Sequence, residues 1–522
     1  MKKFLTKRNI KFLLLILIGT VVLFRPPIDP DFGWHYKYGE YLFQNGKVLK
    51  ENIFSYTNQD YEWVSSYWIP QILLYLSHNF LGNIVPTIIS SFLFSLFLLE
   101  ILKKNSSDTF VISFVFILEI TALTIFVITV RPFYFSTVFL FLLVHILLKE
   151  NKYKKFLPIL FLVWANMHAD FLIGLFILGV YSLFNFLIKT DFSKTTPSLK
   201  NKEGICSYLS YLIEYFIKII KNKNTFKIFF GCFWILIIST LVTLINPYGI
   251  KLWTTLLKEL TQPIKSFVGE WTPIGNGNLN SDHFFIGTIT TILAGLALVP
   301  YNKNNVKFNF WYKFLIVFFY LFFIKAVYFS RIVIIMSTFS IIQNIKCMKD
   351  DICRVYKHVF DSIPSLVSVA FLTFLFIGIF EIFLNNIFMS SSTKEWSKKF
   401  KMPYEAVSYL KNNSVDGNML NDYSWGGYLI WQLPEHKTFI DGRMTAWKIN
   451  EKYLMEDYQK IYYLTDKNVD LLNNYLNQYD IRWLLTRPEN KIVKYLKENR
   501  PDEWEVIFED DVSVILKKID KF

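Results

Sequence analysis

Long apolar runs recur along most of the chain, separated by short polar segments. A helix that crosses a bilayer needs about 20 mostly apolar residues, because its backbone can hydrogen-bond only to itself in hydrocarbon. The pattern therefore predicts an all-α, polytopic membrane region over residues 1–390, with about eleven transmembrane helices. The expected spans lie near residues 9–25, 84–102, 109–130, 132–148, 156–169, 170–188, 228–245, 283–300, 310–328, 330–345 and 363–384.

The hydrophobic pattern changes after the last of these runs. Residues 391–522 contain short alternating segments of the kind that form strands, interspersed with amphipathic helices. This pattern predicts a small α/β domain. Strands are expected at 417–421, 437–440, 481–486, 504–509 and 512–517, with helices at 403–412 and between 450 and 478.

Within the loop that follows the first run, residues 26–82, the segment 68–81 is too short and too polar to be a span. It is expected to form an amphipathic helix on the membrane surface.

Basic residues mark every second loop, which fixes the expected orientation. The chain is 53% hydrophobic and carries a formal net charge of +14, but the tail from residue 395 holds about as many acids as bases. Cytoplasmic loops of membrane proteins are enriched in lysine and arginine, so the N-terminus is expected in the cytoplasm and the tail outside, and nucleic-acid binding is not expected. The basic loops contain Lys103 and Lys104, Lys149–Lys155, Lys189–Lys227, Lys303–Lys307 and Lys346–Lys357.

The basic N-terminal segment and first run also fit the start of a signal peptide. No small-x-small cleavage site follows cleanly, and a retained first helix is therefore expected.

Polar and ionisable residues gather at the expected outer ends of the helices. Such residues near membrane depth are costly and are therefore functional candidates. Helix ends are also wet and tolerate polar residues anywhere, but the cytoplasmic ends here carry lysine and asparagine. The outer ends instead carry acids, histidines and arginines next to Trp, Pro and Gly. The candidates are Asp29, Asp31, Trp34, His35, Arg131, His168, Asp170, Asn246, Glu270 and Arg331.

Two of these candidates, Asp29 and Asp31, stand two residues apart between prolines that favour an extended chain. One carboxylate could accept a proton from an attacking hydroxyl. Together they could hold a divalent cation, Mg²⁺ or Mn²⁺, against a phosphate leaving group. The alternative is that they are ordinary loop acids or helix caps, and a D-x-D pair alone does not separate these interpretations.

The longer segment around these acids resembles the first outer loop of bacterial membrane glycosyltransferases of the GT-C type (Rgt/PMT-like superfamily). The matching features are DPDFGWHYKYG at 29–39, FSY at 54–56 and Trp68, and more thinly RP at 131, WANMH at 164–168 and NPYG at 246–249. In the tail, NDYSWGGYLIW at 421–431 and FIDGR at 439–443 continue the resemblance. Related sequences often have His and Glu around the last Trp of the loop, where this chain has Ser66, Tyr67 and Ile69.

This resemblance implies a GT-C fold in a bacterial inner (plasma) membrane and a polyprenyl-phosphate-linked sugar as the donor. It also implies an acid of the first loop, Asp31 or Asp29, as the catalytic residue, while the acceptor stays unspecified. The two tail motifs have their own alternatives. Gly426, Gly427 and the Asp441–Arg443 segment could form a structural turn with a buried ion pair, or an edge that faces the membrane site and binds acceptor or lipid phosphate.

Two other classes of function compete with glycosyl transfer. A transporter or flippase would place polar groups at mid-bilayer and show paired repeats or broken helices, neither of which is clear here. A non-catalytic partner in the assembly of cell-envelope polysaccharide would use Asp29 and Asp31 only as soluble loop residues. Fold alone does not choose among these functions.

Overall fold

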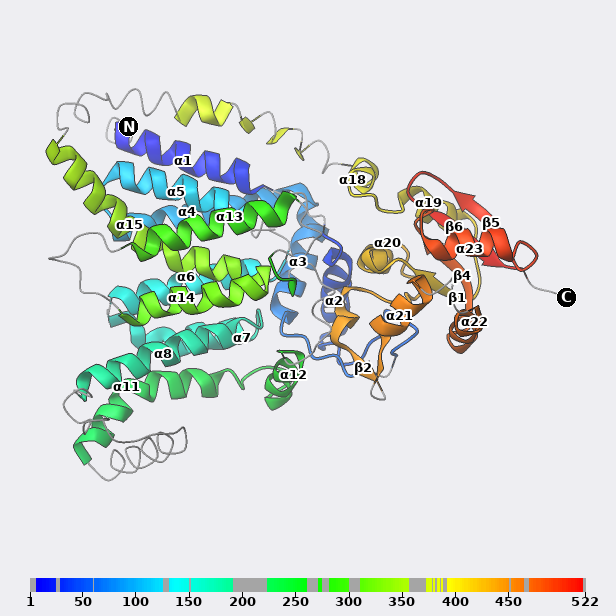
Figure 1. The fold of residues 1–522 in the computed structure, drawn as a ribbon, viewed down its shortest axis with the longest axis horizontal. Helices are drawn as coiled ribbons and strands as arrows, with labels where there is room; N and C mark the ends of the chain where they lie inside the picture. The colour runs from blue at the N-terminus through cyan, green and yellow to red at the C-terminus, as the bar shows by residue number, and fades with distance from the viewer. Residues whose placement is uncertain are drawn as a thin grey trace, which may run out of the picture.

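The computed structural model describes residues 6–24, 29–59, 61–124, 131–149, 152–190, 223–260, 271–274, 281–299, 310–355, 372–377, 379–380, 383–384, 386–387, 392–449, 452–463 and 469–519. A layer of long apolar helices lies at one end, and an α/β region formed by the tail lies at the other (Figure 1). The short helices α2, α3 and α20 lie between them. The described chain is thus a helical membrane region joined to a small sheet-containing region.

The long helices follow the predicted runs but differ from them in length. Four helices in the described chain are long and apolar enough to cross a membrane: Ile84–Asn105, Phe171–Lys189, Asn224–Val242 and Val327–Met348. Three more apolar helices are shorter: Thr109–Leu123, Phe133–Lys149 and Phe284–Leu298. The helices of this region are α1 (Lys7–Leu23), α4 (Ile84–Asn105), α5 (Thr109–Leu123), α6 (Phe133–Lys149), α7 (Leu157–Ala165), α8 (Phe171–Lys189), α11 (Lys223–Val242), α12 (Ile250–Leu260), α13 (Ser281–Leu298), α14 (Phe310–Lys325) and α15 (Ser330–Val355).

The expected count of about eleven spans is therefore not confirmed, since four helices of the described residues meet the criteria. The clearest shortfall is α7, which has nine residues because a 3₁₀ turn, η1 (Lys152–Phe156), precedes it and a turn follows it at Asn166. At about 1.5 Å per residue, nine residues span less than half of a hydrocarbon core about 30 Å thick. Most of the predicted run at 363–384 lies outside the described residues.

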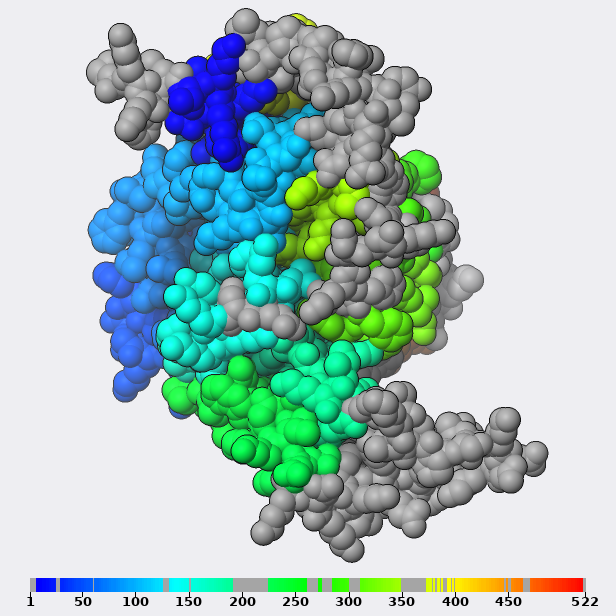
Figure 2. Space-filling model, turned by 90° about the vertical axis from the view of Figure 1, so that its left-hand side faces the viewer, coloured from blue at the N-terminus to red at the C-terminus, as the bar shows by residue number. Residues whose placement is uncertain are grey.

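The helices pack through one large apolar core that runs through the layer. Viewed onto the end that faces away from the tail, α1 and α11 lie at opposite edges (Figure 2). Close packing is visible at Gly19 of α1, where an added Cβ would come 3.0 Å from the Ser95 Cβ on α4. Small residues at such crossings let helix backbones approach closely in a membrane.

The tail forms a four-stranded sheet in the order β1-β4-β6-β5, with β1 parallel to β4 and the other pairs antiparallel. Its helices and strands are α18 (Thr393–Lys399), α19 (Tyr404–Asn412), β1 (Asn418–Asn421), α20 (Gly426–Gln432), the β2–β3 pair (Lys448–Ile449, Lys452–Tyr453), α21 (Leu454–Tyr463), α22 (Val469–Gln478), β4 (Ile481–Thr486), α23 (Lys491–Asn499), β5 (Trp504–Glu509) and β6 (Val514–Lys518). The predicted hairpin is confirmed: the Asp510 carboxylate accepts backbone N–H bonds from Val512 and Ser513.

One predicted strand, 437–440, is wrong. This segment does not join the sheet and pairs with the first loop instead, through a single parallel bridge between Ser55 and Thr438. The Tyr56 N–H donates to the Thr438 carbonyl at 3.1 Å, and the Thr57 hydroxyl donates to the Phe439 carbonyl at 2.7 Å. The backbone of residues 437–440 is therefore hydrogen-bonded to the first loop and not to the sheet.

The first loop therefore lies against the tail. Its two helices are α2 (Phe32–Asn45) and α3 (Trp68–Leu81), and α2 packs against α3 on one side and against α20 on the other. The predicted helix at 68–81 is confirmed as α3. Residues of the first loop and of the tail share one apolar cluster that includes Trp34, Trp63 and Trp447. A domain boundary near residue 390 stays a proposal, since the first loop and the tail have a common core.

Candidate functional site

The acidic segment lies at the N-terminal end of α2, beside the start of α6. The Asp29 carboxylate is buried, accepts the Asp31 backbone N–H at 2.8 Å, and forms an ion pair with the Arg131 guanidinium. The Asp31 side chain is 26% exposed, and it accepts the Trp34 indole N–H at 3.1 Å and lies 3.5 Å from Arg131. Asp29 therefore anchors the segment, and Asp31 is the more accessible of the two acids.

The next turn of α2 supplies a buried histidine. The His35 Nδ1 lies 3.2 Å from the Gln71 amide of α3, which in turn accepts the Ser65 hydroxyl. Burial lowers the pKa of His35 well below its usual value, and the nearby Arg131 and His168 act in the same direction. The imidazole is therefore neutral near pH 7, with one nitrogen that donates and one that accepts a hydrogen bond.

A second polar cluster joins the turn before α8 to the start of α15. The Asp170 carboxylate is paired with the Arg331 guanidinium and accepts the Tyr328 hydroxyl. Arg331 also donates to the Phe133 carbonyl at 3.1 Å. The Asp170 backbone N–H donates to His168 Nδ1 at 3.1 Å. Asp170 and Arg331 are only 3% and 2% exposed, so this cluster is a buried ion pair with satisfied hydrogen bonds.

Tyr67 connects the two clusters. Its ring centroid lies 5.8 Å from that of His35 and 5.3 Å from that of His168. Burial raises the pKa of Tyr67, with Glu259 and Asp170 acting in the same direction, so the phenol keeps its proton. A path of ion pairs, hydrogen bonds and ring contacts therefore runs from Asp29 and Asp31 to Asp170 and Arg331.

The structure thus brings eight of the predicted residues together: Asp29, Asp31, Trp34, His35, Arg131, His168, Asp170 and Arg331. Asn246 makes local hydrogen bonds instead. Its side-chain amide donates to the Thr243 and Gly249 carbonyls and accepts the Tyr248 N–H, and these bonds stabilise the NPYG turn. Glu270 lies outside the described residues.

Two residues that sequence reasoning missed are Tyr67 and Tyr328. Tyr67 was a departure from the GT-C pattern, and nothing in the sequence marked it as central. Trp271, next to the predicted Glu270, stacks on Tyr328 at 4.5 Å, so an aromatic pair closes this end of the cluster.

The tail forms the outer wall of the acidic segment. A Cβ added to Gly427 would overlap the Pro30 carbonyl, and one added to Gly33 of α2 would overlap the Gly427 carbonyl. A Cβ on Gly442 would overlap the Asp31 carboxylate. Only residues without side chains allow the backbones to approach this closely. The GG and DGR motifs therefore hold the segment that carries the two acids.

The DGR motif also contains the buried ion pair that its sequence suggested. Asp441 accepts two side-chain bonds from Arg443, at 2.7 and 2.6 Å. The Arg443 guanidinium lies over the Trp63 ring at 4.7 Å and over Phe54 at 5.1 Å, both in the first loop. The buried ion pair fits the structural alternative, and the neighbouring Gly442 lies against Asp31. Binding of acceptor or lipid phosphate at this edge stays a prediction.

A divalent cation at Asp29 and Asp31 stays a prediction. Within the described residues no group of three or more His, Cys, Asp or Glu side chains is placed to hold a metal ion. The two aspartates offer a small donor set, and the Arg131 guanidinium offsets one of their two negative charges. With Arg131 paired to both carboxylates, the present arrangement fits a cation poorly.

Comparison with known proteins gives a structural likeness only. No protein family description and no curated protein sequence matches the chain. The Archaeoglobus fulgidus oligosaccharyltransferase in its apo form aligns with a TM-score of 0.54 and 10% identity, over 94% of this chain and 70% of that one. The archaeal oligosaccharyltransferase AglB from the same organism, in complex with an inhibitory peptide and a dolichol-phosphate, aligns with a TM-score of 0.54 and 10% identity. The alignment covers 91% of this chain and 69% of that one.

A third structure is the same oligosaccharyltransferase tethered to an acceptor peptide containing the NVT sequon. It aligns with a TM-score of 0.53 and 10% identity, over 94% of this chain and 70% of that one. This chain therefore shares its fold with these oligosaccharyltransferases. At this identity the likeness shows the fold and leaves the activity to be argued from the site.

Removal of one partner of the buried Asp170–Arg331 pair is expected to destabilise the protein. Arg331→Ala leaves the Asp170 charge buried without its partner, which typically costs about 3–5 kcal/mol. The double variant Asp170→Asn/Arg331→Gln removes both charges and is expected to regain part of that loss. Thermal unfolding in detergent measures both effects. Unchanged stability together with weaker donor binding in Arg331→Ala would instead favour a direct role at a lipid phosphate.

Proposed function

We propose that this protein is a membrane glycosyltransferase that moves a sugar from a polyprenyl-phosphate-linked donor to an acceptor on the outer face of a bacterial inner membrane. The observation that carries the proposal is the convergence of Asp31, Asp29 and Arg131 with His35 and its neighbours at one end of the helical layer. Their wall is formed by the tail, and the fold around them is that of oligosaccharyltransferases. One such oligosaccharyltransferase forms a complex with a dolichol-phosphate, which is a polyprenyl phosphate.

In this mechanism Asp31 is the general base. It accepts the proton of the attacking acceptor group as that group bonds to the anomeric carbon of the sugar, and the bond from that carbon to the phosphate oxygen breaks. The electron pair of the broken bond leaves with the polyprenyl phosphate. A general base contributes roughly 10²–10⁴-fold to such rates.

Arg131 has two tasks in this scheme. It holds Asp29, and through it the loop, and its guanidinium lies within reach of Asp31, where a leaving phosphate would develop negative charge. A planar guanidinium matches phosphate oxygens in a two-pronged way. The neutral His35 can donate one further hydrogen bond beside it.

The proposal is tested by reconstituting the purified protein in liposomes with a polyprenyl-phosphate-linked sugar. With cell-envelope extract added as the source of acceptor, transfer of the sugar to the extract with release of polyprenyl phosphate is expected, and only when the first loop faces the donor's sugar. Orientation is read from single cysteines in a cysteine-free chain: Lys50→Cys and Glu435→Cys should react with an impermeant thiol reagent from outside, and Lys104→Cys and Lys152→Cys should not. All four positions are exposed.

Reaction of Lys104→Cys from outside, with protection of Lys50→Cys, would place the site in the cytoplasm and contradict the proposal. Absence of donor turnover in correctly oriented protein would leave the non-catalytic partner as the better account.

A further inference from the structure

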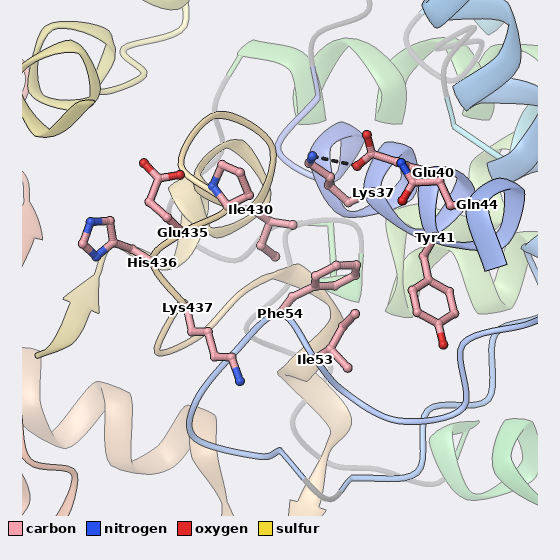
Figure 3. Close-up of a pocket in the computed structure, with 11 residues that line it drawn as sticks. Lys37, Glu40, Tyr41, Gln44, Ile53, Phe54, Ile430, Glu435, His436 and Lys437 are labelled. Carbon is pink, nitrogen blue, oxygen red and sulfur yellow. Dashed lines mark hydrogen bonds and ion pairs between the residues drawn. The ribbon is translucent and has the colours of Figure 1, made fainter. Parts of the chain in front are cut away.

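Helix α2 presents two different faces to its surroundings. Side chains of one face, Tyr41 among them, line a groove of about 310 Å³ beside the tail (Figure 3). His35 and Gly39, one turn apart, lie on a face that packs against α3, where a Cβ added to Gly39 would overlap the Gln71 carbonyl. This close approach places the side chain of Gln71 beside the imidazole of His35.

A chain of hydrogen bonds runs from the backbone of Tyr67 to His35. The Tyr67 N–H donates to Ser65 Oγ at 3.3 Å, and the Ser65 hydroxyl donates to Gln71 Oε1 at 3.2 Å. The Gln71 side-chain nitrogen then lies 3.2 Å from His35 Nδ1. Ser65, Gln71 and His35 are all buried, so each polar atom of the chain depends on these bonds.

The direction of this chain fixes the position of the proton on the imidazole. Because Gln71 Oε1 accepts the Ser65 hydroxyl, the amide N–H is the group that faces His35 Nδ1, and Nδ1 must accept. The reverse orientation of the amide would leave the Ser65 hydroxyl proton without an acceptor within the described residues, which is costly for a buried group. The neutral His35 therefore carries its proton on Nε2.

The protonated Nε2 is the open end of the chain. Within the part of the protein that the structure describes, it has no hydrogen-bond partner and retains some exposure. The His35 ring lies 3.6 Å from the Trp34 ring, whose indole N–H is bonded to Asp31. Burial, and then the charge of Arg131, lower the pKa of His35. The site thus contains a neutral donor of fixed direction near a guanidinium and the proposed general base.

A phosphate oxygen is the partner that such a donor suits. It accepts hydrogen bonds and cannot donate one, so it is attracted to Nε2–H and would be repelled by an unprotonated Nε2. A sugar hydroxyl can donate as well as accept, so it binds either form of the imidazole. A buried amide that holds one form is therefore of use for a phosphate and not for a hydroxyl.

We propose that His35 donates its Nε2–H to an oxygen of the leaving polyprenyl phosphate, and that Gln71 is the positioning residue that keeps the proton on Nε2. The inference rests on the proposed glycosyl transfer and adds these two roles to it. Negative charge grows on the phosphate as its bond to the anomeric carbon breaks. The hydrogen bond strengthens at that moment, and the proton stays on Nε2. Removal of one such donor typically lowers kcat by roughly 10²–10³-fold.

Nitrogen NMR of the full-length protein in detergent, with ¹⁵N-labelled histidine, reads the position of the proton. The chain has seven histidines, and the signals of His35 are those that disappear in His35→Ala. At pH 8 the wild type is expected to carry the proton on Nε2 and none on Nδ1. Gln71→Glu replaces the amide by a carboxylate of nearly the same size, which only accepts, so the proton is expected on Nδ1 in that variant.

Farnesyl phosphate, a short polyprenyl phosphate, tests the contact with phosphate, and farnesol is the probe without it. Farnesyl phosphate is expected to shift the Nε2 signal of His35 in the wild type, and farnesol is not. Gln71→Glu should bind farnesyl phosphate at least tenfold more weakly. Asn79→Asp is the matched control, because it makes the same change from amide to acid at an exposed position of α3. It should bind as the wild type does.

The inference is overturned if the wild type carries the proton on Nδ1, or if farnesyl phosphate leaves the Nε2 signal of His35 unchanged. Binding by Gln71→Glu that equals binding by Asn79→Asp would also overturn it. Both wild-type measurements decide the matter even if Gln71→Glu does not fold. Failure of the proposed function is a separate result: a protein that binds farnesyl phosphate at His35 and transfers no sugar would contradict glycosyl transfer and keep the phosphate contact.

Discussion

Replacement of Asp31 by Asn is expected to lower the rate of sugar transfer by roughly 10²–10⁴-fold, the usual contribution of a general base. Asn has nearly the size of Asp and can still accept the Trp34 indole N–H that Asp31 accepts at 3.1 Å. It cannot take up a proton at neutral pH. Packing is thus kept while proton transfer is lost. The measurement is transfer of labelled sugar from lipid-linked donor in membranes, normalised to protein level.

Asp29→Asn provides the contrast. Asp29 is buried, forms an ion pair with Arg131 and accepts the Asp31 backbone N–H. Its replacement by Asn removes the negative charge of that ion pair and weakens the contacts that hold the loop. A loss of both stability and transfer is expected for Asp29→Asn, whereas Asp31→Asn should lose transfer with an unchanged melting temperature. Full transfer by the double variant would remove the catalytic role of both residues.

Replacement of Gly427 by Ala is expected to lower transfer about 10²-fold, although Gly427 belongs to the tail and touches no reacting atom. The new Cβ would overlap the Pro30 carbonyl, so α20 and the acidic loop must move apart. A shift of about 1 Å at a catalytic group can cost on the order of 10²-fold in rate. Gly442→Ala should have a smaller effect of the same kind, because its Cβ meets the Asp31 side chain, which can rotate.

Gly295→Ala on α13 is the matched control, since an added Cβ there meets nothing within 4 Å. Steady-state kinetics separate positioning from general damage: kcat should fall in Gly427→Ala while the melting temperature of the membrane helices stays near that of Gly295→Ala. Normal transfer by Gly427→Ala would show that the tail does not hold the acidic loop.

The periodicity of the sequence predicts elements well where the pattern is local. Strands β1, β4, β5 and β6 lie close to their predicted ranges because each is a short run bounded by polar residues, with β1, β4 and β6 buried over consecutive positions. Helix α3 lies on its predicted range because it buries one face. The wrong strand at 437–440 has the same local pattern, but its backbone pairs with residues 54–57. The pairing partner of an extended segment depends on the fold, and no window of sequence contains it.

The candidate site was predictable in its residue types and not in its pairings. Charged residues at outer helix ends were visible in the sequence, and eight of the candidates lie along one path. Arg331 pairs with Asp170, and Arg131 pairs with Asp29. These ion pairs depend on how α6, α8 and α15 pack. The role of Gly427 was hidden because a GG pair is typical of a turn, whereas here it marks where two backbones touch.

The wall that the tail places against the acidic loop has a consequence for biosynthesis. Translation proceeds from the N-terminus, so the two aspartates are made early and Gly427 and Gly442 are made last. A nascent chain that carries only the helical layer presents the acids without the glycines that position them. The site is therefore completed only when the tail has folded onto the first loop. A chain that is cut short before the tail would keep the two aspartates but lack the wall that positions them.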